Sequence, residues 1–356
     1  MNERGPEGFN VPAVEAWIGE CVECLDPPFQ WTRLEGGHSN LTYRLDSADG
    51  TTAVIRRPPQ GPLLPKAHDM SREWALISAL GPTAVPVPRA LGFCETPDVT
   101  GAWFYVMGWV EASPLYNAED TIHRVPKTQR VAMARDFFGV LASLHKLAPD
   151  DIGLGDLAKK DGYVARQLST WYRSWTASAD TAQFDDPRVH RLKDFFAKHM
   201  PQQGPARVVH GDYGLHNCLI GRDARVAAVV DWEIATLGDP LADLAYALNP
   251  WPEQLSDEEV DLSSATSADG FPSRSELAQH YADLTGANLE QLEYYVGFNG
   301  WKSAAILQGV YARYQQGNKS AEGADLVALR SRIGRSLDFA ERAVHRYEMA
   351  STGKQR

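Results

Sequence analysis

The chain has 356 residues, which is long enough for two domains or one large one with a substantial core. Its residues are 44% hydrophobic and 23% charged, a composition typical of soluble globular proteins. The formal net charge of −11 argues against general nucleic-acid binding, because such binding depends on lysine and arginine side chains that meet phosphate.

Targeting and redox signals are weak in this sequence. The first residues lack the apolar run of a secretory signal, and no stretch approaches the length of about 18 apolar residues that suggests a membrane span. Cys21 and Cys24 form a CxxC pair, but no second pair follows at the spacing of a zinc site. We therefore expect a cytoplasmic protein with reduced thiols and no membrane partner.

The first 111 residues predict a small antiparallel sheet with one main helix. A short helix over 11–25 precedes three strands within 29–57, and a glycine-bearing turn joins the first two strands. Helical spacing of apolar residues follows within 63–80, and a strand rich in aromatic and branched residues covers 102–110.

From about residue 112 the pattern becomes mostly helical. The strands expected in this half surround one motif, "VVHGDYGLHNCLIG" (208–221), and a third follows in "VAAVVDW" (226–232). The polar, acidic segment 253–275 reads as a loop. Amphipathic helices are expected over 127–148, 162–178, 188–200, 289–317 and 324–349.

Three oxygen-bearing side chains are placed for phosphoryl transfer. Asp212 follows a short apolar strand, Asn217 comes five residues later, and Asp231 ends another strand. An aspartate in the first position can accept the proton of a substrate hydroxyl. The other two supply the hard oxygen ligands that Mg²⁺ prefers. We therefore predict Asp212, Asn217 and Asp231 as the catalytic residues, with Asn217 and Asp231 as metal ligands.

The two histidines of the motif raise a second hypothesis, a metal-dependent hydrolase. His210, Asp212 and His216 could together ligate a transition metal. Under that interpretation Asn217 and the glycine turn of the first domain have no role, and further ligands are not evident. We expect His210 instead to hold the loop through hydrogen bonds and packing.

The motif 208–220, followed by "VAAVVDWEIATLGDPLADLAY" (226–246), resembles the aminoglycoside phosphotransferase-like branch of the protein-kinase-like fold. The chain is especially similar to the kinase-like domains fused to acyl-CoA dehydrogenases, from "GGHSNLTYRL" to "AAILQGVYARYQQGN". The resemblance implies an α+β, two-lobe fold, with a nucleotide-binding N-lobe over 1–111 and a mostly helical C-lobe over 112–356. It gives Asp212 the role of the base, and Asp231 that of the aspartate opening the kinase DFG motif. Asp239 and Asp243 match positions that brace the catalytic loop, and we favour a helix N-cap for Asp239 and a buried hydrogen-bonding acid for Asp243.

The resemblance also implies ATP and Mg²⁺ as cofactors. The turn over the phosphates would comprise Gly36, Gly37, His38, Ser39 and Asn40, where glycine lets the backbone approach closely.

Kinases carry a lysine on the third strand, paired with a helix glutamate, but this chain has Arg56 and Arg57 there. Alternation from Val54 selects Arg56, with Glu73 as its partner. The adenine edge would meet the backbone near Met107 to Val110, with Met107 and Trp109 as apolar walls.

These features predict an ATP- and Mg²⁺-dependent small-molecule kinase that phosphorylates a substrate hydroxyl, acting as a monomer or homodimer and without nucleic acid. A hydroxy acid or hydroxyacyl compound is the favoured acceptor, with Lys302 and Arg313 available to meet its acidic groups. An antibiotic phosphotransferase is one alternative, and a catalytically silent nucleotide-binding or scaffold protein is another, suggested by the missing lysine. Candidate acceptor contacts, each with a stronger expectation of a core role, are Trp171, Tyr295, Asn299, Trp301, Gln308 and Tyr311.

Overall fold

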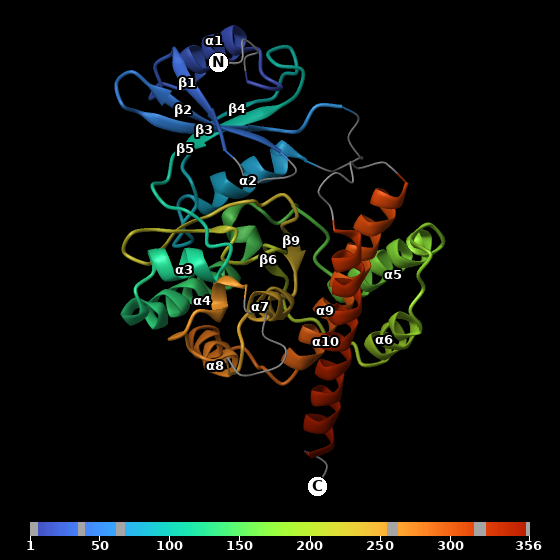
Figure 1. The fold of residues 1–356 in the computed structure, drawn as a ribbon. Coiled ribbons are helices and arrows are strands. Elements are labelled where there is room, and N and C mark those ends of the chain that lie inside the picture. Colours follow the sequence, from blue (N-terminus) through green and yellow to red (C-terminus); the bar gives the residue numbers. More distant parts are fainter. Residues whose placement is uncertain (1–5, 35–39, 62–67, 255–262, 317–324, 354–356) are drawn as a thin grey trace.

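A computed structural model describes residues 6–34, 40–61, 68–254, 263–316 and 325–353. The chain forms two lobes, a small one built on an antiparallel sheet and a larger, mostly helical one (Figure 1). This confirms the α+β fold predicted from the sequence.

The small lobe contains a five-stranded antiparallel sheet in the order β1-β2-β3-β5-β4. Helix α1 lies against one face and α2 lies on the side toward the large lobe (Figure 1). Its elements are α1 (Val11–Cys21), β1 (Phe29–Arg33), β2 (Leu41–Ser47), β3 (Thr52–Arg57), α2 (Met70–Leu80), β4 (Ala90–Cys94) and β5 (Phe104–Gly108).

Strand alternation sends successive side chains of the sheet into two different cores. Leu45 and Ile55 pack with Val14 of α1, whereas Val54 and Met107 belong to a core shared with α2 and the large lobe. Arg56, two residues after Val54, therefore faces the large lobe.

In the large lobe two short β-ladders support the motif 208–221. Strand β6 (Arg207–Val209) pairs with β9 (Thr236–Gly238), and β7 (Cys218–Ile220) pairs with β8 (Val226–Val229). The helical elements are α3 (Ala118–Arg124), η1 (Lys127–Gln129), α4 (Arg130–Lys146), η2 (Pro149–Ile152), α5 (Tyr163–Ala182), α6 (Pro187–Lys198), α7 (Pro240–Leu248), η3 (Ala265–Ser267), α8 (Arg274–Thr285), α9 (Leu292–Gln315) and α10 (Leu326–Gly353).

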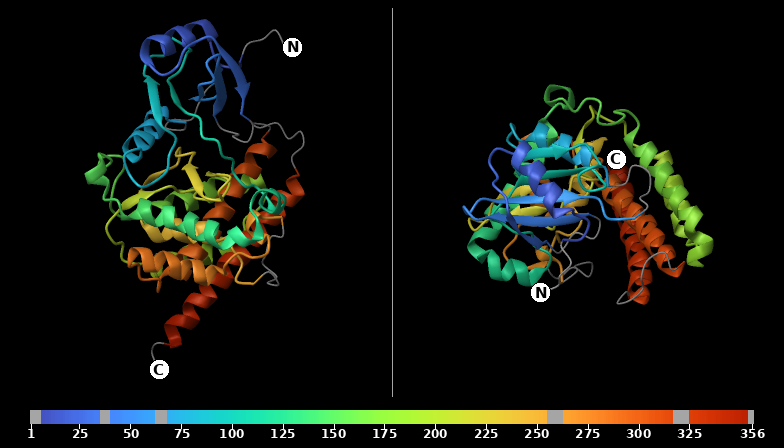
Figure 2. Two further views of the ribbon diagram at one scale, coloured as in Figure 1. Left: turned by 90° about the vertical axis from the view of Figure 1, so that its left-hand side faces the viewer. Right: turned by 90° about the horizontal axis from the view of Figure 1, so that it is seen from above.

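The helices of the large lobe form two groups. Helices α4 and α8 pack together beneath the β-ladders, whereas α5, α9 and α10 pack as a second group with its own apolar core. Seen from above, this second group lies beside the small lobe, outside its outline (Figure 2). No helix among the described residues is long and apolar enough to cross a membrane.

Several local predictions need correction. The helix expected over 11–25 ends at Cys21, and the expected loop 253–275 contains η3 and the first residues of α8. Strand β4 was missed because its segment follows a proline-rich stretch and its pairing is interrupted between Ala90 and Gly92. All four cysteines are free in the structure.

Candidate active site

The loop between β6 and β7 carries the first predicted catalytic residue. Its backbone is anchored to α7, because the carboxylate of Asp243 accepts the N–H groups of His210 (2.5 Å) and Gly211 (2.8 Å). Gly211 has φ +84°, and a Cβ there would lie 3.2 Å from the side chain of Ile234. The loop thus needs glycine at 211 and an acid at 243 to present Asp212.

Asp212 is surrounded by hydrogen-bond donors. Its Oδ1 accepts the hydroxyl of Tyr246 and lies 3.3 Å from Nε2 of His216, while its Oδ2 accepts Nδ2 of Asn217 at 3.1 Å. Burial raises the pKa of the Asp212 carboxyl, but His216 and Tyr246 outweigh that effect and hold this pKa below its ordinary value. Asp212 is therefore an anion at neutral pH.

Asn217 is connected to Asp212 and, through its backbone carbonyl, to the residue that precedes Asp231. Its Nδ2 donates to the Asp212 carbonyl (3.0 Å) as well as to its carboxylate, and its own carbonyl accepts the N–H of Val230 at 2.9 Å. Two acceptors around one end of the amide fix its orientation. Among the described residues no donor approaches Oδ1 of Asn217, so this oxygen is free to bind a cation.

Asp231 follows β8 and is tied to the small lobe by Arg56. Nη2 of Arg56 lies 2.6 Å from Oδ1 of Asp231, and Nε lies 3.2 Å from Oε2 of Glu73. Burial lowers the pKa of Arg56, but Glu73 and Asp231 raise it well above its ordinary value, so the guanidinium stays charged. The expected partners Arg56 and Glu73 are brought together, and Arg57 instead binds the carbonyls of Gly8 and Thr100.

A second connection between the lobes passes through Asn40. Its Nδ2 donates to Glu73 (3.2 Å) and to Glu233 (3.2 Å), the residue two positions after Asp231. His68 also lies 3.6 Å from Glu233. Glu233 was missed as a site residue, and its only sequence signal was its place in "DWE". The predicted Gly36, Gly37, His38 and Ser39 lie outside the described residues.

The predicted hinge, Met107 to Val110, includes the last two residues of β5 and the two residues after it. Met107 is buried in the core on the α2 side of the sheet, together with Val54. The guanidinium of Arg44 lies 4.6 Å above the ring of Trp109, whose Nε1 donates to Glu111 at 2.9 Å. Both walls predicted for an adenine thus lie on the side of the sheet that faces the large lobe, and contact with a nucleotide remains a prediction for Met107, Trp109 and Val110.

The two histidines are used in ways that disfavour a transition-metal site. His210 is fully buried, and its Nε2 lies 3.0 Å from the carbonyl of Val230, so it holds the loop as expected. His216 contacts Asp212 rather than His210. Within the described part of the chain no three His, Cys, Asp or Glu residues gather as a metal site.

Tyr246 was missed as a contact of Asp212. It lies 34 residues away on α7, and only the folding of α7 onto the loop brings the two side chains together. The sequence offered no signal beyond its position at the end of "LGDPLADLAY". Burial and the nearby Asp212 carboxylate raise the pKa of the Tyr246 hydroxyl, which keeps it a donor.

Most of the suggested acceptor contacts are core residues. Tyr295 donates to Asp239, Asn299 to the carbonyl of Ala242, and Trp301 to that of Val189. Gln308 and Tyr311 are also buried. Trp171 and Lys302 are partly exposed, and Arg313 is exposed.

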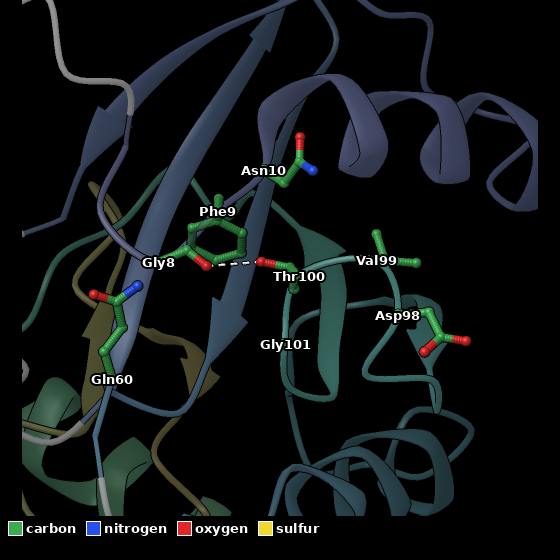
Figure 3. Close-up of a pocket in the computed structure, with 8 residues that line it drawn as sticks. All are labelled: Gly8, Phe9, Asn10, Gln60, Asp98, Val99, Thr100 and Gly101. Carbon is green, nitrogen blue, oxygen red and sulfur yellow. Dashed lines mark hydrogen bonds between the residues drawn. The ribbon is translucent and has the colours of Figure 1, made fainter.

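A pocket among the described residues lies apart from Asp212 and its neighbours. It has a volume of about 370 Å³ and opens on the small lobe, where Thr100 donates to the carbonyl of Gly8 (Figure 3). Its lining shares no residue with the Asp212 site. The residues that line it are Gly8, Phe9, Asn10, Gln60, Asp98, Val99, Thr100 and Gly101.

The donor set fits a hard divalent cation. Asn217 offers an amide oxygen, and Asp231 offers a partly exposed carboxylate whose Oδ1 contacts Arg56. Mg²⁺ is bound in proteins by one or two such oxygens and keeps several waters. These two residues are those that would hold it.

The sheet-based small lobe, the helical large lobe and the loop between β6 and β7 that carries Asp212 define a protein-kinase-like enzyme. Residues 30–277 match the model of the phosphotransferase enzyme family, and the chain belongs to this family. It is similar to acyl-CoA dehydrogenase family member 11 from human (34% identical over 90% of this chain and 41% of the relative) and from chicken (36% identical over 82% and 37%). The chain thus spans about two fifths of the length of these relatives.

Solved structures agree with this fold. A Ralstonia eutropha protein, provisionally assigned as an aminoglycoside phosphotransferase, is 29% identical, with a TM-score of 0.78 over 94% of this chain and 99% of that one. Spectinomycin phosphotransferase in complex with ADP and spectinomycin is 11% identical, with a TM-score of 0.63 over 95% and 98%, and shows the shared fold alone. The family predicted from the motif 208–246 is confirmed.

Proposed function

We propose that this chain is an ATP- and Mg²⁺-dependent kinase that phosphorylates a hydroxyl group of a small molecule. The observation that carries this proposal is the contact of Asp212 with Asn217, whose backbone carbonyl accepts the N–H of Val230, the residue before Asp231. Arg56 in turn ties Asp231 to the small lobe. Related folds bind nucleotides, as in the ADP complex of spectinomycin phosphotransferase and the GDP complex of an aminoglycoside 2'-phosphotransferase.

Each residue has a defined task in this reaction. The acceptor oxygen forms a bond to the γ-phosphorus while the bond to the β-phosphate oxygen breaks, and the hydroxyl proton passes to the Asp212 carboxylate. Tyr246, His216 and Asn217 hold this carboxylate in place. Bound Mg²⁺, held by Asn217 and Asp231, would neutralise charge on the phosphates.

We further propose a hydroxy acid or hydroxyacyl compound as the acceptor. The names of the relatives, acyl-CoA dehydrogenase family member 11 in human and chicken, support this proposal. The alternative, an aminoglycoside or other antibiotic, is supported by the names of the solved structures. A panel of hydroxy acids, hydroxyacyl-CoAs and kanamycin-like compounds, assayed for phosphorylated product, separates the two.

The base is tested by Asp212→Asn. Phosphoryl transfer in a single turnover should fall by about two to four orders of magnitude, because the proton acceptor is lost. Nucleotide affinity, measured by calorimetry with ATP and Mg²⁺, should stay within about threefold. The exposed Asp223→Asn serves as the matched control. Equal nucleotide binding without turnover in either the native chain or the variant would favour the silent scaffold instead.

A further inference from the structure

Lys302 is a partly buried cation on the inner side of α9. One turn before it, Asn299 donates to the carbonyl of Ala242, so this side of the helix faces α7. On its other flank the Lys302 ammonium lies 5.9 Å from the ring centre of Trp171 on α5. Lys302 therefore sits where α5, α7 and α9 meet.

Lys302 is under the electrostatic influence of one carboxylate on the loop and one on α7. Burial lowers the pKa of its ammonium, and the carboxylates of Asp243 and Asp212 act in the opposite direction. Both carboxylates already have donors of their own. Asp243 accepts two backbone N–H groups and lies 3.4 Å from His145, while Asp212 is held by Tyr246, His216 and Asn217.

The ammonium has no such partner. Among the residues that the structure describes, Lys302 makes neither a hydrogen bond nor an ion pair, and its one polar contact is the face of Trp171. Withdrawing an ammonium from water without a direct ion-pair partner costs free energy, so an unpaired, partly buried lysine is a site for an anion. No described residue pairs with this ammonium, so it is available to an anionic group of a bound molecule.

Resting on the proposed kinase function, we infer that Lys302 recognises the acceptor by binding an anionic oxygen group on it, in the first place a carboxylate. The acceptor's hydroxyl then lies at Asp212 and its carboxylate at Lys302. Trp171 provides an apolar wall beside the connecting carbons. The same cation disfavours polycationic aminoglycosides, because like charges repel in a partly desolvated site.

Lys302→Met and Lys302→Arg test the inference with hydroxy carboxylic acids and the matching primary amides as acceptors. The native chain should phosphorylate the acid in preference to the amide. In Lys302→Met the KM for the acid should rise by about tenfold to a hundredfold, the loss expected for one hydrogen bond to a charged group, and the arginine should recover part of it. The KM for the amide should change by less than about twofold.

Arg313→Met is the matched control. Arg313 is exposed on the same helix, about 16 Å from Lys302 along its axis, too far for a short hydroxy acid to reach from Asp212. A KM for the acid that stays within about twofold in this variant supports a local role for Lys302. An equal rise in both variants would overturn the inference.

A binding readout independent of turnover completes the test. With a non-hydrolysable ATP analogue present, the acids but not the amides should protect Lys302 from trinitrobenzenesulfonate, as measured by peptide mass. Preference for amides or aminoglycosides as acceptors, or no protection by any acid, overturns the inference and leaves the kinase proposal standing. No phosphorylation of any acceptor, with nucleotide turnover the same in Asp212→Asn, overturns the kinase proposal itself.

Discussion

At residue 56 an arginine stands where protein kinases carry a lysine, and its fork gives it two carboxylate partners at once. Glu73 of α2 and Asp231 of the large lobe both lie on this guanidinium, and Glu73 also accepts the hydroxyl of Tyr105 at 2.9 Å. Burial raises the pKa of Glu73 to about 7, with Arg56 acting against this rise. A single side chain thus links β3, α2 and the large lobe.

Removal of this guanidinium should destabilise the fold. Arg56→Met leaves two carboxylates without their cation, at a cost of about 3 to 5 kcal/mol in the free energy of unfolding. Arg56→Lys should lose less, because an ammonium keeps the charge. Urea unfolding measures both, with Arg225→Met as the control, since its exposed pair with Asp136 should contribute less than about 1 kcal/mol. Equal losses of unfolding free energy in Arg56→Met and Arg225→Met would contradict a stabilising role for the contacts of Arg56 with Glu73 and Asp231.

Asp243 should make the free energy of unfolding depend on pH in the acidic range. Burial raises the pKa of its carboxyl, but the hydrogen bond from His145 and the nearby backbone N–H groups bring it below the ordinary value. The Asp243 carboxyl therefore takes up its proton at a higher pH in the unfolded chain than in the folded one, at about 3.9. The stabilisation is present above this pH and is lost as pH falls through the lower, folded pKa.

In Asp243→Asn this acid-dependent loss should shrink, and stability at neutral pH should fall by about 2 to 4 kcal/mol because an amide cannot accept as the carboxylate does. Urea titrations at a series of pH values between neutral and strongly acidic conditions give both quantities. The exposed Glu95→Gln is the control. If the free energy of unfolding depended on pH in the same way in the native chain and in Asp243→Asn, Asp243 would not be the source of the acid-dependent loss.

The central residues of the candidate site could be predicted because they share one local motif. Asp212 follows β6, Asn217 directly precedes β7 and Asp231 follows β8, all within twenty residues, and their spacing together with the flanking strands suggested convergence. Tyr246 could not be found in this way, because a tyrosine on a helix is a common core residue. Lys302 was named only as a charge on an acidic chain, since its unpaired state depends on three helices packing together.

At the scale of elements, α7 shows how a helix terminus supports the loop. Asp239 caps it by accepting the N–H of Leu241 at 3.0 Å, as predicted, and its other oxygen accepts the hydroxyl of buried Tyr295 at 2.6 Å. The start of α7 is thereby fixed to α9.

Asp239→Ala should lower the free energy of unfolding by about 2 to 4 kcal/mol, because it removes a cap and leaves a buried hydroxyl without an acceptor. Tyr295→Phe should cost only about 1 kcal/mol, because Asp239 still caps the helix. Thermal and urea unfolding of both single variants and the double variant give the coupling energy. Strict additivity of the two changes would show that this hydrogen bond contributes nothing.

The elements that the sequence left unpredicted are short or lie among turn residues. Strand β9 has three residues, and α3 and α8 begin at capping boxes, Asn117 with Asp120 and Ser273 with Glu276. The second of these boxes begins within the segment 253–275, which was predicted to be a loop. The formation of these elements depends on caps and on tertiary packing, and their apolar periodicity is too brief to detect.

For the whole molecule, the contact between α9 and α10 holds the outer group of helices together. Gly300 lets the two helices approach closely, because a Cβ there would lie 3.0 Å from the carbonyl oxygen of Ser336 and 2.9 Å from Phe339 Cδ1. Gly334 on α10 has no atom within 4 Å of such a Cβ. Substitution by alanine should therefore change stability in opposite directions at the two glycines.

Gly300→Ala should destabilise the chain by about 1 to 3 kcal/mol, since backbone must move to admit the methyl group. Gly334→Ala should stabilise it by about 0.5 to 1 kcal/mol through the better helix propensity of alanine. The midpoints of urea unfolding of Gly300→Ala and Gly334→Ala, each compared with that of the native chain, test these two predictions. Changes of the same sign would mean that α10 does not pack on α9 as described.

The carboxamide of Asn217 has a consequence for how the reaction is aligned. Its nitrogen is committed to Asp212, so only its oxygen can turn toward a cation. The proton acceptor and the ion ligand are then separated by the length of one small, planar, rigid group. In the proposed reaction a displacement of one would be transmitted to the other, so activation of the acceptor hydroxyl and binding of the cation by Asn217 would change together.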